Sequence, residues 1–192
     1  NMSGDKDSEY FSDGLTEEIL NALARNPELR VAARTSSFAF KGRNMAVDEI
    51  GRALRAASVI EGSVRKSGNR VRITVQLINA ADGYHVWSET FDRELTDIFA
   101  VQDEIAAKVA QKLGGGAAPA VATAGANATV PTKNLVAYDA YLRGRAAQTS
   151  GFSEELSAVT VRHYEEAVRL DPDYALAWAR LAWYARQQEP VH

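Results

Sequence analysis

The sequence predicts an α+β domain over residues 1–113, a linker over residues 114–133 and a purely helical segment over residues 134–192. Residues 59–78, VIEGSVRKSGNRVRITVQLI, hold two alternating apolar runs around a short polar turn, the pattern of an antiparallel hairpin. Apolar stripes at helical spacing lie on both sides of this hairpin. Residues 114–131, GGGAAPAVATAGANATVP, have no charged or aromatic residue, which is typical of a flexible linker.

The first expected helix follows a polar opening and ends at Pro27. Ser12 is its expected N-cap, and residues 15–23 carry its apolar stripe. Residues 29–33 alternate in polarity and predict a strand. A short second helix is expected over residues 47–54, where apolar residues recur every three or four positions.

The hairpin should bury one face, because its second run alternates strictly. The residues that point to the expected core are Val71, Ile73, Val75 and Leu77. Residues 84–91 predict another extended run. The residues that contribute large apolar surface in this run are Val86, Trp87 and Phe91. A helix is then expected from about Thr96, with its stripe over residues 98–109 and Gly114 at its left-handed end.

The bulk composition is that of a globular protein. Hydrophobic residues make up 46% of the 192 residues and charged residues 24%, and no apolar run approaches the ~20 residues that span a bilayer. The absence of cysteine excludes disulfides, thiolate zinc sites and cysteine nucleophiles. The chain begins at Asn1 without Met and stops within a helical pattern, so we expect a fragment of a longer protein.

Positive charge is concentrated in residues 25–72, which hold eleven Lys or Arg and four Asp or Glu, a net charge of +7. Such a region can bind a polyanion, so nucleic-acid binding is one hypothesis. The favoured interpretation is that these cations are the solvent-facing neighbours of buried strand residues, namely Arg30, Arg65, Arg70 and Arg72. Nucleic acid is therefore not the partner that we expect.

No motif in the sequence predicts catalysis, a cofactor or a metal. The histidines, His85, His163 and His192, lack the i, i+4 spacing of a metal pair. The glycine run at residues 114–116 lacks the Lys-Ser/Thr ending of a phosphate loop, and no GxSxG turn occurs. We therefore predict that this region is not an enzyme, with no catalytic, cofactor-binding or metal residues.

Residues 1–113 resemble the amino-terminal domain of TolB, in the form found beside tetratricopeptide repeats in bacterial signalling proteins. The matching segments are NMSGD at residues 1–5, EYFSDGLTEEI at 9–19, ARTSSFAFKG at 33–42, the long stretch at 59–95 and IFAVQDEIA at 98–106. The resemblance implies a small mixed sheet with helices, akin to the anticodon-binding domain. In such relatives a strand ending in Pro-Phe precedes the NMSGD segment, so the resemblance implies that the first strand is missing here.

Residues 134–192 resemble tetratricopeptide repeats, whose paired helices touch at small residues and whose second helix closes with a proline. The residues that match this pattern are Gly144, Tyr164, Ala167, Pro172, Trp178, Leu181 and Ala182. Trp178 and Leu181 are expected in the repeat core. The first repeat is irregular, with its helix at residues 138–147 and an extra stretch at residues 148–155.

Three aromatic residues of the last helix are candidates for protein contact, namely Trp183, Tyr184 and Tyr174. Proteins with this domain pairing commonly carry a class III nucleotide cyclase, a winged-helix transcription regulator or a protein kinase. We therefore expect a cytoplasmic regulatory region beside an adenylate or guanylate cyclase, with a protein partner or self-association through the helices. The alternative is a periplasmic scaffold of a membrane-anchored winged-helix regulator.

Overall fold

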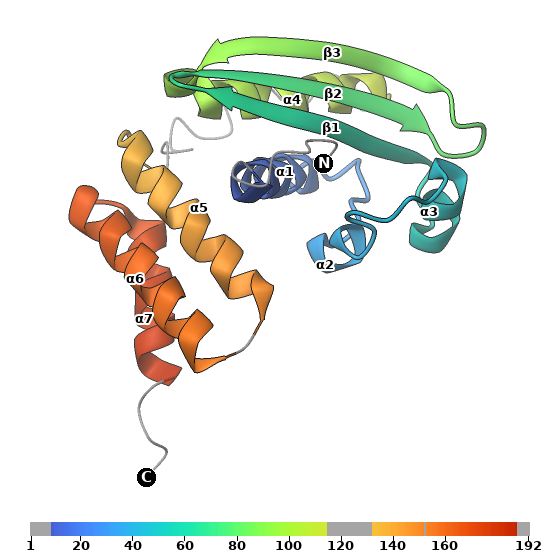
Figure 1. The fold of residues 1–192 in the computed structure, drawn as a ribbon. Coiled ribbons are helices and arrows are strands. Elements are labelled where there is room, and N and C mark those ends of the chain that lie inside the picture. The colour runs from blue at the N-terminus through green and yellow to red at the C-terminus, as the bar shows by residue number, and fades with distance from the viewer. Residues whose placement is uncertain (1–8, 115–131, 152, 188–192) are drawn as a thin grey trace. The chain divides into compact units, whose positions relative to one another are not determined.

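The computed structural model describes residues 9–114, 132–151 and 153–187 of the chain (Figure 1). The chain divides into two compact units, residues 1–126 and residues 127–192. Residues 115–131, most of the expected linker, lie outside the described residues. The architecture is α+β, as the sequence predicts, with a three-stranded sheet in the first unit and helices alone in the second.

The first unit places its strands between helical segments. In chain order its elements are α1 (Glu9–Ala24), α2 (Arg34–Phe38), α3 (Val47–Leu54), β1 (Ser58–Ser67), β2 (Arg70–Asn79), β3 (His85–Glu94), the 3-10 turn η2 (Leu95–Asp97) and α4 (Ile98–Lys112). The strands lie in the order β1-β2-β3, and both neighbouring pairs are antiparallel. The prediction of a mixed sheet is therefore wrong for the described residues. The connections from β1 to β2 and from β2 to β3 are too short for the crossover that parallel strands need.

The hairpin of β1 and β2 is confirmed. Val64 lies opposite Ile73, and the turn places Gly68 at a φ of 56°, which glycine adopts without strain. The alternating residues of β2 are buried as predicted, and α1 and α4 lie along the same side of the sheet (Figure 1). The predicted stripe of α4 is buried too, at Ile98, Val101, Ile105 and Val109.

Two local predictions in the first unit are wrong. Ser12 does not cap α1; it lies inside the helix, buried with Phe11, and its carbonyl accepts a hydrogen bond from the Thr16 hydroxyl at 2.8 Å. Residues 29–33 form no strand, because alternation yields a strand only where a neighbouring backbone completes the ladder, and no described residue pairs with them. The residues that follow form the single-turn α2.

The strand β3 buries only part of its predicted apolar surface. Phe91 lies opposite Ile73 and is buried, whereas Val86 is 49% exposed and Tyr84 is more exposed still. The register explains the difference: Trp87 pairs with Leu77 and His85 with Ile78, so Val86 is the extra residue of a bulge.

The second unit consists of α5 (Leu135–Ser150), α6 (Glu154–Leu170) and α7 (Ala175–Gln187). The helix α6 packs against both α5 and α7. The predicted extra stretch at residues 148–155 is wrong, because α5 continues to Ser150 and α6 begins at Glu154. None of the described helices combines the length and the apolar character that a membrane span requires.

Candidate functional site

The helix α7 carries the aromatic residues predicted as a contact surface, but the structure divides them. Tyr174, just before α7, and Tyr184 are buried, so their prediction as surface residues is wrong. Their rings pack on those of Tyr141 and Tyr164, with centroids 5.1 Å and 6.3 Å apart. Positions 174, 177 and 184 share the helix face toward the preceding pair, which explains their burial.

The prediction that Trp178 and Leu181 of α7 lie in a repeat core is also wrong in part. Trp178 is 48% exposed, and its indole N–H donates a hydrogen bond to the Pro172 carbonyl at 2.8 Å. Leu181 is half-buried and Ala182 is exposed. Trp178 lies one residue beyond the buried Ala177, about 100° around the helix, and so stands at the edge of the buried face.

The residues of α5 and α6 that match the repeat pattern are buried, unlike Trp178, because these two helices pack against each other. Gly144, Tyr164 and Ala167 are all buried. The tetratricopeptide identity itself stays a prediction, since helix packing alone does not name a repeat family.

Trp183 lies where it was predicted, with 45% of its surface exposed. Leu176, seven residues earlier on the same side of α7, is 46% exposed. These two residues form an apolar surface that we call the Leu176/Trp183 stripe. The sequence pattern does not single out Leu176, because its helical phase becomes evident only once the buried face is known. Ala179, which lies between them on this side of the helix, is exposed too, and a contiguous exposed apolar patch is the feature that marks protein contacts.

A second candidate lies in the first unit, where a cavity of about 360 Å³ opens between α1, β1 and residues 29–41. We call it the β1 groove. Its apolar lining comes from all three segments and from α3, and includes Leu15, Ile19, Val31, Phe38, Ile50 and Ile60. Nothing in the sequence pattern signals this cavity, because its walls come from segments far apart in the chain.

Ion pairs connect residues 34–41, which border the β1 groove, to α1. Arg34 Nε lies 2.9 Å from a carboxylate oxygen of Glu17, and Lys41 Nζ lies 2.7 Å from Glu9 and 2.6 Å from Asp13. Partial burial opposes protonation of Lys41, but the hydrogen bonds and negative charges of Asp13 and Glu9 outweigh it and raise the pKa of Lys41. The ammonium therefore stays charged over the physiological pH range.

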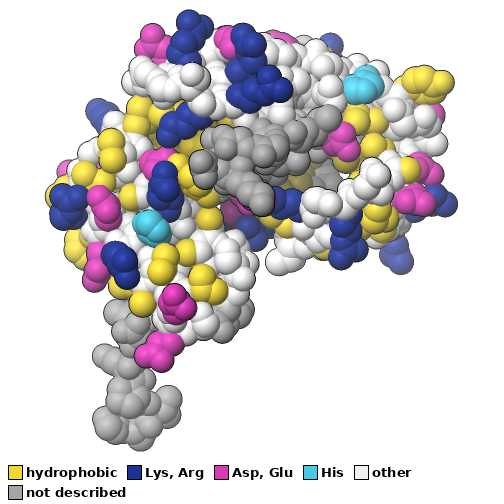
Figure 2. Space-filling view, viewed as in Figure 1, with side chains coloured by type: hydrophobic (Ala, Val, Ile, Leu, Met, Phe, Trp, Pro, Cys, Tyr) yellow, Lys and Arg dark blue, Asp and Glu magenta, His cyan; other side chains and the backbone are white. Residues whose placement is uncertain are grey.

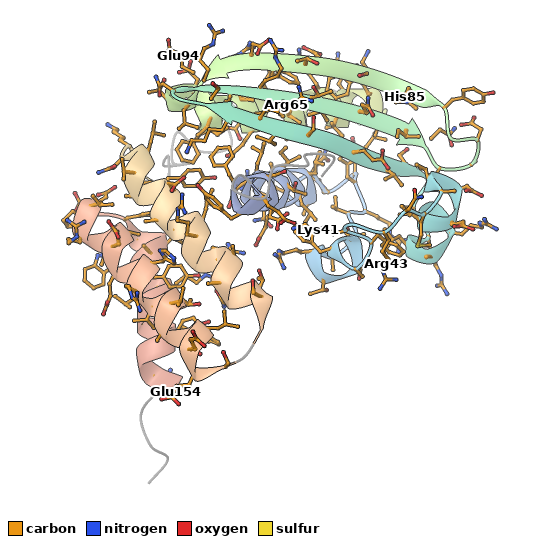
Figure 3. The ribbon with its side chains drawn as sticks, viewed as in Figure 1. Lys41, Arg43, Arg65, His85, Glu94 and Glu154 are labelled. Atoms are coloured by element: carbon orange, nitrogen blue, oxygen red, sulfur yellow. The ribbon has the colours of Figure 1, made fainter. Side chains whose placement is uncertain are left out.

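Several cations of the basic region 25–72 are paired with carboxylates. Arg34, Arg52 and Arg72 are each ion-paired with a carboxylate, those of Glu17, Asp48 and Asp92 respectively. On the face visible in Figure 2, Lys and Arg side chains lie among Asp and Glu side chains, except on the sheet, where several Lys or Arg side chains gather. In Figure 3, Arg65 lies on the sheet while Lys41 and Arg43 lie beside α2. This distribution does not favour a polyanion site.

No metal centre emerges from the described parts of the chain, where no three acidic, His or Cys side chains gather. His85 begins β3 in the first unit, as Figure 3 shows, whereas His163 belongs to α6 in the second. His192 lies outside the described residues. Each of the two units thus contributes a single histidine to the described residues.

The chain is similar to a protein of Rhizobium meliloti (strain 1021) named "Putative adenylate cyclase 3", with 39% identity over 185 residues. The two proteins are homologous over nearly all of this chain. The match covers 95% of the chain but only 30% of the relative. No protein-family model matches the chain.

Proposed function

We propose that this chain is a regulatory and protein-interaction region of a bacterial signalling protein that carries a nucleotide cyclase elsewhere in its polypeptide. The observation that carries the proposal is the 39% identity, over 95% of this chain, to 30% of a protein named as an adenylate cyclase. The remaining length of such a protein is enough for a separate catalytic domain.

The surfaces of the chain support an interaction role. The Leu176/Trp183 stripe offers apolar side chains on a rigid helix, and aromatic residues of this kind are enriched at the centres of protein interfaces. A region coupled to a cyclase works in the cytoplasm, where its nucleotide substrate is found. Neither the winged-helix alternative nor the nucleic-acid alternative gains a specific observation.

The test compares three proteins: the product of the complete reading frame, the same protein without residues 1–192, and residues 1–192 alone. Conversion of ATP and of GTP to the cyclic nucleotides is measured for each. We expect cyclase activity in the complete protein, an altered rate or an altered dependence on protein concentration after the deletion, and no turnover by residues 1–192. A complete protein without cyclase activity, or turnover by residues 1–192 alone, contradicts the proposal.

A further inference from the structure

The face of the sheet that points away from α1 and α4 carries a group of arginines where β1 ends and β2 begins. Both helices lie along the other side of the sheet, as Figure 1 shows, where Val64 and Val71 are buried. Side chains alternate between the two faces of a strand, so Arg65, Arg70 and Arg72 belong to the open face. All three are exposed. We call this group the arginine cluster.

Two of these arginines lie side by side on neighbouring strands. Arg65 is directly opposite Arg72, a position at which Cβ atoms are about 5 Å apart and like charges destabilise a sheet. Asp92 of β3 neutralises only one of them, because its carboxylate accepts two hydrogen bonds from Arg72, at 2.8 and 3.0 Å. Arg65 forms no ion pair with another described residue, and Arg70 attracts Asp92 only at longer range. Two guanidinium groups of the cluster are therefore open to a further carboxylate.

Asp92 shows how a carboxylate binds on this face. Hydrogen bonds from Arg72, with the positive charges of Arg72 and Arg70, outweigh desolvation and lower the pKa of Asp92. The charged carboxylate is therefore the form that this surface stabilises. A carboxylate beside Arg65 can adopt the same two-bond geometry, because a guanidinium presents parallel N–H groups. Its negative charge also relieves the repulsion between Arg65 and Arg72.

We propose that the arginine cluster binds a short acidic segment of a partner protein, in which one Asp or Glu side chain pairs with Arg65 and another lies near Arg70. Ser63 and Thr74 lie opposite each other in the next row of the open face. Their hydroxyl groups can donate to carboxylate or carbonyl oxygens of such a segment. Exposed ion pairs are individually weak, so the contact contributes specificity and fast association more than affinity.

Acidic residues on the same face limit the length of the bound segment. Asp92 and Glu94 of β3 border the arginine cluster on one side, and Glu61 lies on the same face of β1. A nucleic acid carries a phosphate at every nucleotide, and these carboxylates repel the phosphates that continue beyond the cluster. An acidic protein segment can instead continue with neutral residues. Charge complementarity on this face therefore favours a protein segment over a polyanion.

This inference names a partner chemistry for the interaction role proposed above and rests on that role. The two can fail separately, because binding to the arginine cluster is measured without a cyclase readout. A complete protein without cyclase activity leaves a positive binding result unchanged, and an absence of binding leaves the cyclase comparison unchanged.

An NMR titration of residues 1–192 tests the proposal. The probe is a blocked hexapeptide of alternating Glu and Asp, and the matched probe has Gln and Asn at the same positions. The Nε–Hε signals of Arg65 and Arg70 should shift saturably with the acidic peptide alone, with a dissociation constant of about 0.1–1 mM in about 50 mM NaCl. The affinity should fall at least about threefold in about 300 mM NaCl, because salt screens exposed charges.

Two double variants provide the control, and each removes two positive charges. Arg65→Gln with Arg70→Gln should weaken binding of the acidic peptide at least about fivefold, because the proposed carboxylate partners are lost. Arg43→Gln with Arg52→Gln removes two exposed arginines that lie outside the sheet and should leave binding unchanged. Circular dichroism verifies that both variants fold.

Four outcomes would overturn the proposal. The first is the absence of a saturable shift with the acidic peptide, or an equal shift with the neutral peptide. The second is equal weakening in both double variants, which shows that net charge alone matters. The third is tighter binding of a single-stranded oligonucleotide of equal charge, which identifies a nucleic-acid site. The last is a shift with inorganic phosphate and none with the peptide, which identifies a site for small anions only.

Discussion

Gly144 of α5 lies directly against the ring of Tyr164 of α6. A Cβ atom at position 144 would stand 2.7 Å from Cε1 and 2.8 Å from Cδ1 of that ring. The ring has little room to move, because it is completely buried, its hydroxyl donates to Gln148 at 2.9 Å, and the ring of Tyr141 packs against it. The close approach of α5 and α6 therefore requires glycine at this position.

Gly144→Ala should destabilise the helical unit, although alanine favours a helix by about 1 kcal/mol. Overpacking of a rigid core costs about 1–3 kcal/mol, so a net loss of up to about 2 kcal/mol is expected in the free energy of unfolding. Urea denaturation followed by tryptophan fluorescence measures it. In a Tyr164→Leu background, where the ring is gone, the same substitution should become neutral or stabilising; an equal cost in both backgrounds contradicts the packing argument.

Asn134 joins the start of α5 to the end of α6. Its side-chain oxygen accepts from Val136 N and Ala137 N at 3.0 and 3.2 Å, and its amide donates to the Leu170 carbonyl at 2.9 Å. Asn134→Ala should cost about 1–3 kcal/mol, since it removes both a cap and a hydrogen bond between helices.

The matched control is Ser153→Ala at the cap of α6. The Ser153 hydroxyl makes a single cap bond, which it accepts from Leu156 N at 3.1 Å. Ser153→Ala should therefore lower the free energy of unfolding by about 1 kcal/mol. Thermal unfolding of the variants gives the comparison. Equal losses at both caps would show that the bond from Asn134 to Leu170 contributes nothing measurable.

His163 should make the helical unit less stable in mild acid. Burial and the nearby Arg143 and Arg162 lower its pKa below the ordinary 6.5, although Glu166 and Asp139 act in the opposite direction. The unfolded chain then binds more protons than the folded one as the pH falls through 6.5, so stability decreases there until the folded imidazole is protonated too. At pH values well above 6.5, the contribution of His163 to stability does not change with pH.

The imidazole pKa is measured by an NMR titration of the histidine Hε1 signals, and the free energy of unfolding is compared at pH 7.5 and 5.5. The effect should be small, because the side chain is only partly buried and solvent screens its charge. His163→Gln should remove the part of the pH dependence that belongs to this residue. A titration at or above the ordinary value would refute the prediction.

Phe91 and Val86 lie on the same strand but should respond differently to truncation. Phe91 is buried opposite Ile73, so Phe91→Ala should cost about 3–5 kcal/mol. Val86 stands exposed in the bulge, so Val86→Ala should change stability by less than about 0.5 kcal/mol. Similar losses measured by chemical denaturation would contradict the bulge and the register of β3.

Trp183→Glu should lower self-association of residues 1–192 without changing the stability of the first unit. The reason is that a charge in the Leu176/Trp183 stripe opposes burial of this surface against another chain. Multi-angle light scattering over a concentration series measures the effect. Ala182→Glu adds the same charge at another exposed position of α7 and should have less effect. A monomer at every concentration, unchanged by either substitution, indicates that the stripe is tolerated in water.

The sequence by itself determined the elements whose signal is local and repeated. Strict alternation over Val71 to Leu77 predicted a buried strand, and the 3.6-residue period from Ile98 to Val109 predicted α4, because burial of one face imposes its period on the sequence. The polar residues between the two alternating runs predicted the hairpin turn, and the second unit is helical as predicted.

Only the tertiary structure decided which of several apolar surfaces found a partner. Residues 29–33 alternate as a strand does, yet strand formation depends on a second backbone that the described residues do not supply. Tyr184 and Trp183 are neighbours of similar character in sequence, but a rotation of about 100° buries one against α6 and exposes the other. The β1 groove has no signature in the sequence for the same reason: the shape of a cavity depends on how distant segments pack, and residue type alone does not encode it.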